Sequence, residues 1–159
     1  MNFQVVALPE AEFQALYGLS DEALAVRGVR TMTALSNSAY PCRVSLRDAD
    51  VGARMFLLNY EHQPARSPYR SSHAIYVQDG AVNAAVATNT VPEVLRTRLL
   101  SIRAFDHDGM IVDAEVVQGT DAASVFQRLL SNETAAYLHV HNAKRGCYAA
   151  RVERVTEQR

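Results

Sequence analysis

The chain has 159 residues, of which 48% are hydrophobic and 21% are charged, and its formal net charge is −1. A chain of this size and composition buries enough apolar surface to fold without disulfides or a structural metal, so we predict a single domain over residues 1–159. The nearly balanced charge argues against an overall field that gathers nucleic acid or anionic lipid.

The N-terminus indicates the expected compartment, and the compartment in turn predicts the state of the cysteines. Residues 1–9 lack the basic region and the longer apolar stretch of a signal peptide, and no apolar run approaches the length that spans a membrane. We therefore expect a cytoplasmic protein with no nucleic-acid or membrane partner. Cys42 and Cys147 are the only cysteines, and in that compartment they are expected to be reduced thiols.

Short elements separated by turns are predicted at the start of the chain. A strand over residues 3–8 precedes a short helix that begins at Pro9 and ends at Gly18. Ser20 is the expected N-cap of a second helix, and Gly28 suits the position just after its end.

The middle of the chain predicts strands and one long loop. Residues 63–72 carry two prolines and three serines without any period, which predicts an exposed loop. The strands expected on either side of this loop cover residues 29–35, 43–46, 54–61 and 73–78.

Two helices and two hairpins are predicted in the second half. Pro92 begins a helix that carries Val91, Leu95 and Leu99 on one face, and residues 121–131 have the spacing of an amphipathic helix. The hairpins are expected from residues 101–106 with 110–117, and from 135–141 with 147–155.

The order of these elements predicts the fold class. Several hairpins and few βαβ spacings favour an α+β fold over a doubly wound sheet. We expect one mainly antiparallel, mixed sheet of about seven or eight strands, with about three or four helices packed on it as a single layer.

The segment from Tyr137 to His141 is the first candidate site, because Tyr137, His139 and His141 share one face of a strand. Two imidazoles at this spacing stand roughly 6–7 Å apart and can reach one metal ion. The spacing alone is a weak signal, so no residue is assigned as a metal ligand. The alternative is two histidines that hydrogen-bond in a polar groove. The available third ligands are Glu61, His62, His73 and Cys147.

Cys147 is a candidate nucleophile, since it follows the hairpin loop and an imidazole could activate its thiol. Pairing of His141 with Cys147 would put both on one face, whereas pairing of His141 with Tyr148 would turn the thiol to the other face. A buried cysteine that acts as a small apolar side chain is the alternative interpretation.

Glu61 and His62 end a predicted strand and are candidate general bases. Neighbouring residues face opposite ways in a regular strand, and only a bend at Gln63 and Pro64 would bring the two together. Solvated surface residues are the alternative interpretation here.

An anion-binding loop is the third candidate, because an arginine fork holds a carboxylate or a phosphate through two hydrogen bonds. The arginines could instead pair with neighbouring carboxylates and fix the loop. The residues that would bind the anion are Arg66, Tyr69, Arg70 and His73, joined by Arg43 and Arg145 if their loops meet at the same end of the sheet.

Seven segments of the sequence resemble a known family over nearly the whole chain. They are Tyr40–Leu46, Leu57–Gln63, Ser67–Arg70, Arg103–Asp106, Gly109–Asp113, His139–Asn142 and Gly146–Tyr148. The chain resembles the uncharacterised bacterial domain-of-unknown-function 1203 family. The resemblance implies one domain in a bacterial cytosol, and it brings no activity, cofactor or catalytic residue.

The sequence therefore leads to three functional hypotheses. The first is a small-molecule enzyme or binder for a small anionic metabolite, in which His139 or His141 acts as acid or base and Cys147 as a thiolate. The second is a protein-interaction or homodimeric module without catalysis, which uses the loop and an exposed strand edge. The third is a metal-binding protein that uses the two strand histidines. The cofactor stays unidentified.

Overall fold

The computed structural model describes residues 1–156, and these residues form two five-stranded sheets and three α-helices. The α+β class is confirmed, but the expected single sheet is wrong. Hydrogen bonds between strands far apart in sequence decide which strands share a sheet, and alternation of apolar residues does not reveal those partners.

The described chain divides into two compact units. The first contains Met1–Val6, Glu61–Ser71 and the segment that begins at Ala85, and the second contains Ala7–Tyr60 and Ser72–Ala84. The single domain expected over residues 1–159 stays a prediction.

An antiparallel sheet forms the centre of the first unit, with the strand order β1-β10-β9-β7-β8. The hairpin expected around residues 108 and 109 is confirmed as β7 and β8, and the last two strands also pair as expected. The strands are β1 (Phe3–Val6), β7 (Leu99–Phe105), β8 (Ile111–Gln118), β9 (Tyr137–Asn142) and β10 (Tyr148–Arg154).

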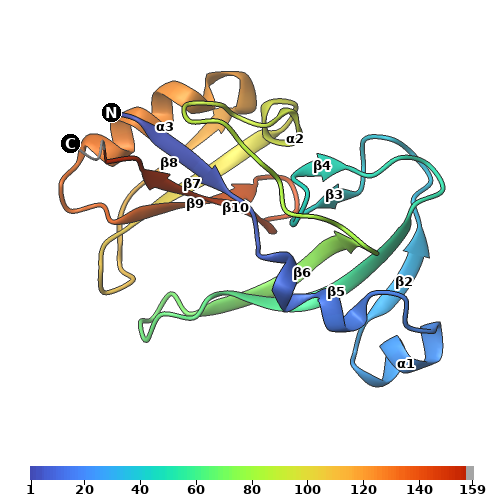
Figure 1. Cartoon of the computed structure of the whole chain (residues 1–159). Helices are drawn as coiled ribbons and strands as arrows, with labels where there is room; N and C mark the ends of the chain where they lie inside the picture. Colours follow the sequence, from blue (N-terminus) through green and yellow to red (C-terminus); the bar gives the residue numbers. More distant parts are fainter. Residues whose placement is uncertain (157–159) are drawn as a thin grey trace. The chain divides into compact units, whose positions relative to one another are not determined.

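Helix α3 (Ala122–Ser131) covers one face of this sheet and contacts all five strands (Figure 1). It confirms the amphipathic helix expected over residues 121–131. Phe126 is fully buried and meets Phe3 edge to face, with their ring centroids 5.3 Å apart. Leu138 and Val140 are also fully buried, and their alternation turns the next side chains of β9 to the opposite face.

The second unit has the strand order β2-β5-β6-β3-β4, in which β3 pairs antiparallel with β4 and parallel with β6. β5 and β6 continue past its boundary, so their ends belong to the first unit. The strands are β2 (Arg30–Thr33), β3 (Pro41–Cys42), β4 (Arg47–Asp48), β5 (Arg54–Gln63) and β6 (Ser71–Gln78).

Three local predictions were wrong. Residues 43–46 are the turn between β3 and β4, and the burial of Val44 and Leu46 in that turn imitates a strand pattern. The helix expected from Pro9 to Gly18 is instead two 3₁₀ turns, Glu10–Glu12 and Gln14–Leu16, separated at the buried Phe13.

The third correction concerns α2 (Glu93–Arg96), which ends before Leu99 because Leu99 begins β7.

The N-cap prediction for Ser20 is confirmed, since the Ser20 hydroxyl accepts a hydrogen bond from the Ala23 N–H at the start of α1 (Asp21–Val26).

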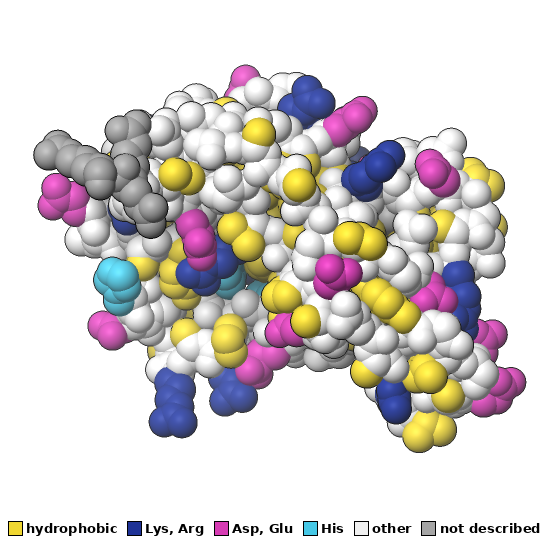
Figure 2. Space-filling view, in the orientation of Figure 1, with side chains coloured by type: hydrophobic (Ala, Val, Ile, Leu, Met, Phe, Trp, Pro, Cys, Tyr) yellow, Lys and Arg dark blue, Asp and Glu magenta, His cyan; other side chains and the backbone are white. Residues whose placement is uncertain are grey.

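The charged side chains on the face seen in Figure 2 are interspersed, without a large patch of one sign. This agrees with the balanced net charge of −1. Within residues 1–156, no helix has both the length and the apolar character that crossing a membrane requires.

Candidate metal centre

Strand β9 places two histidines on the sheet face opposite α3. His139 and His141 are 3% and 2% exposed, and they alternate with the apolar Leu138 and Val140 as the sequence predicted. The apolar side chains pack under α3, so the fold itself turns both imidazoles to the other face.

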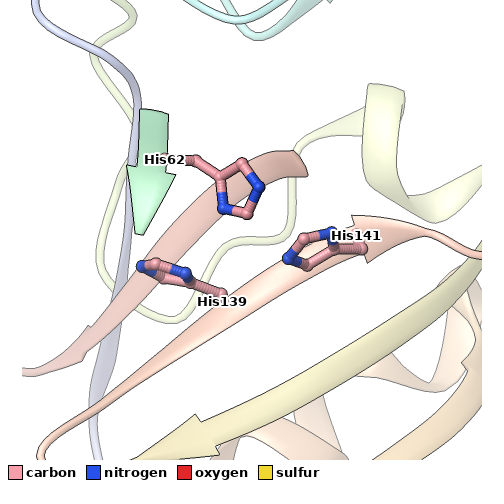
Figure 3. Close-up of side chains that lie close together, drawn as sticks. All are labelled: His62, His139 and His141. Carbon is pink, nitrogen blue, oxygen red and sulfur yellow. The ribbon is translucent and has the colours of Figure 1, made fainter. Parts of the chain in front are cut away.

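His62, near the end of β5, brings a third imidazole to the same place (Figure 3). Its ring centroid lies 5.0 Å from that of His141 and 6.2 Å from that of His139. One potential ligand nitrogen from each of the three residues lies within 4.8 Å of the others, and all three residues are buried. All three also belong to the first unit.

The chain next to His62 is fixed to the first sheet by polar contacts. The side-chain amide of Gln63 donates a hydrogen bond to the Tyr137 hydroxyl at 3.0 Å. Further along the loop, the Ser67 hydroxyl donates to the Gly109 carbonyl at 2.8 Å. These contacts hold His62 against β9.

The hydrogen bonds and burial of the histidines leave ring nitrogens that can bind a metal ion. His141 Nδ1 lies 2.9 Å from the Gly146 carbonyl, which only accepts, so Nδ1 carries a proton and, in the neutral imidazole, Nε2 has the lone pair. Among the described residues, His139 Nδ1 has no hydrogen-bond partner although it is buried. This nitrogen is therefore available to bind a ligand.

The electrostatics keep His139 neutral. Burial lowers its pKa to about 3, and repulsion from His141, Arg151, His62 and Arg103 acts in the same direction. A neutral imidazole is the form that binds a metal ion, so His139 needs no deprotonation near neutral pH.

Aromatic rings form the wall of the site. Tyr148 stacks on His62 with an interplanar angle of 9° and a centroid distance of 5.3 Å, and it meets His139 edge to face at 5.1 Å. Phe105 meets His139 on another side at 5.1 Å. These rings restrict the imidazoles to a few orientations.

Sequence reasoning missed the part played by Tyr148. The structure pairs His141 with Tyr148, which selects one of the two registers left open by the sequence. Cys147 then follows the opposite alternation, and its thiol lies 3.6 Å from the side-chain nitrogen of Asn142. The thiol is not beside the imidazoles, and both cysteines are buried and free.

Glu61 and His62 face opposite ways, because no bend reunites them. Glu61 is exposed and forms an ion pair with Arg70 at 3.0 Å, whereas His62 is buried. Arg70 therefore follows the alternative interpretation of the loop arginines, in which an arginine pairs with a neighbouring carboxylate.

The remaining predicted anion ligands are divided between the two units. Arg66 and Arg145 are exposed, and Tyr69 meets Phe105 edge to face at 6.3 Å. Arg43 and His73 belong to the second unit, where the Arg43 guanidinium donates to the Pro41 carbonyl at 2.6 Å.

Comparison with known proteins identifies the family. Residues 39–154 match the family described as "Protein of unknown function (DUF1203)". The matched segment covers more than half of the chain and includes the three histidines of the candidate metal centre. Neither the curated proteins nor the solved structures include a significant match. The resemblance found in the sequence is thereby confirmed, and the chain belongs to the DUF1203 family.

Proposed function

We propose that this protein binds one divalent first-row metal ion, with Zn²⁺ as the best fit, through His62, His139 and His141. The observation that carries the proposal is the mutual approach of three buried ligand atoms to within 4.8 Å. Without an ion, the buried Nδ1 of His139 has no hydrogen-bond partner among the described residues, at a cost in stability.

The donor set supports zinc. Imidazole nitrogen suits Zn²⁺, Cu²⁺, Fe²⁺ and Ni²⁺, and zinc imposes no geometry of its own through d electrons. Zinc–nitrogen bonds of about 2.0–2.1 Å place tetrahedral nitrogen ligands about 3.4 Å apart. The histidine nitrogens, which lie at most 4.8 Å apart, therefore need to move closer together to bind one zinc ion.

Three protein ligands leave one position for water or substrate, as in catalytic rather than structural zinc sites. An ion held in this way lowers the pKa of its bound water to about 7 and polarises a carbonyl or phosphoryl oxygen. The reaction class that we propose is metal-assisted hydrolysis of a small molecule. His62, His139 and His141 would then be ligands rather than the acid and base of a metal-free site.

Titration of metal-stripped protein with Co²⁺ tests this proposal, because tetrahedral and five-coordinate cobalt absorb visible light. The wild-type chain is expected to develop visible bands that saturate at one ion per chain, and excess Zn²⁺ should abolish them. His62→Ala should weaken cobalt binding by at least 100-fold. His107→Ala is the matched control, since His107 is exposed in the β7–β8 turn. Equal binding by wild type and His62→Ala would refute the proposed centre.

A further inference from the structure

Arg103 is one of two arginines that flank the three-histidine centre across the sheet, and Arg151 of β10 is the other. Arg103 pairs with His139 between β7 and β9, so the two side chains stand side by side on the face that carries the imidazoles. Its charge is one of the causes that lower the pKa of His139. Sequence reasoning did not select Arg103.

Arg103 also differs from Arg151 and Arg128 in its contacts. Arg151 pairs with Glu153 at 2.6 Å and lies 3.9 Å above the Tyr137 ring, and Arg128 pairs with Glu115. Among residues 1–156, the guanidinium of Arg103 has no hydrogen bond, ion pair or ring contact. Arg103 is half-buried, and this burial lowers its pKa. A guanidinium nevertheless stays protonated in proteins, so an uncompensated charge lies at this position.

The sheet is open on the side of Arg103 that faces away from the histidines. Arg103 pairs there with Ala114 of the edge strand β8, and Ala114 is small and exposed. Its neighbour on the same face, Val116, is 61% exposed. The half-buried Arg103 side chain is therefore partly accessible to a small molecule from solvent.

The charges at this site require an anion. Three neutral imidazoles contribute no charge. A divalent ion and Arg103 together therefore place a total charge of about +3 on a partly buried face. Arg151 lies on the same face and also repels a charged His139, but its ion pair with Glu153 offsets part of its charge. Burial of positive charge without a counter-ion is unfavourable, and an arginine fork matches the oxygen pair of a carboxylate or phosphate.

We infer that Arg103 and the metal ion together bind a small oxyanion, a carboxylate or phosphate group of the substrate. The guanidinium holds two oxygens of the anion, and one oxygen lies towards the open coordination position. This inference rests on the proposed metal centre and gives it a substrate class. It also moves the anion site expected from the sequence away from the loop that holds Arg66 and Arg70.

Anion titration of the cobalt-loaded protein tests the inference, with acetate, oxalate and inorganic phosphate as separate probes. At least one of them should shift the visible cobalt bands in a saturable way. Arg103→Gln should weaken the binding of that anion at least 10-fold, although the variant still binds one cobalt ion. Arg103→Lys should weaken anion binding less. Arg128→Gln, which removes an arginine on the α3 side of the sheet, should match wild type. The probe that binds best distinguishes a carboxylate from a phosphate substrate.

The outcomes separate this inference from the proposed metal centre. Cobalt binding with the same anion affinity in wild type and Arg103→Gln would overturn the role of Arg103 and leave the metal centre intact. Failure to bind cobalt would refute the metal centre. In that case thermal unfolding of the metal-free protein with each anion still tests Arg103, and absence of a shift that depends on Arg103 would overturn the inference. Far-UV circular dichroism verifies that each variant is folded.

Discussion

His139 shows how much of the candidate site is determined by one residue and its neighbours. Alternation along a strand predicted that His139 and His141 share a face, and the structure has both on the face opposite α3. The partner that completes the cluster, His62, was one of four equally available candidates. Only the approach of β5 to β9 selects it, and that approach joins segments far apart in the sequence.

Burial of His139 predicts a specific dependence of stability on pH in the metal-free protein. Its pKa is about 3 in the folded state, below the usual 6.5, mainly because of burial. The unfolded chain therefore binds a proton that the folded chain does not as pH falls from about 6.5 towards 3. The contribution of this residue is fully present above pH 6.5, is lost on acidification and is of the order of several kcal/mol.

Urea unfolding at a series of pH values checks this expectation. In His139→Gln the free energy of unfolding should fall less steeply between pH 6.5 and pH 4 than in the wild type. His107→Gln should retain the wild-type slope, because His107 is exposed. Parallel curves for wild type and His139→Gln would show that the folded protein protonates His139 as readily as the unfolded chain.

The elements that the sequence predicted well are those with local signals. The β7–β8 hairpin has an Asp-Gly turn, and α3 has the repeat of an amphipathic helix. The errors at residues 43–46 and at Pro9–Gly18 fall where apolar side chains are buried within turns. Burial there imitates the pattern of a regular element, so periodicity alone misleads.

Gly119 is an element-scale constraint that the sequence did not reveal. It lies in the 3₁₀ turn Gly119–Asp121 between β8 and α3, and a Cβ atom there would approach the Leu95 carbonyl oxygen to 1.9 Å. Gly119→Ala therefore has to displace the backbone around α2. We expect it to lower the free energy of unfolding by about 1–3 kcal/mol, as overpacking typically does.

Chemical denaturation of Gly119→Ala beside Thr120→Ala measures this effect. Thr120 is the exposed neighbour, so its substitution should change stability by no more than about 0.5 kcal/mol. Equal stability of both variants and the wild type would contradict the close approach of Gly119 to α2.

For the whole molecule, the family is established and the function is proposed. Membership of the DUF1203 family supports no activity by itself, so the functional argument rests on the histidine cluster and on Arg103. The sequence did not predict the division of the strands between two sheets, because β3 joins β6 through a parallel pairing without a local signal. The interaction module without catalysis stays a prediction at this scale.

The metal content of the purified chain tests the central claim most directly. The protein is produced without a histidine tag, loaded with Zn²⁺, desalted and measured by inductively coupled plasma mass spectrometry, beside the double variant His139→Ala, His141→Ala and the control His107→Ala. We predict about one zinc ion per chain in the wild type and the control and almost none in the double variant. Wild-type protein without zinc, or a double variant that keeps it, would contradict the three-histidine metal centre.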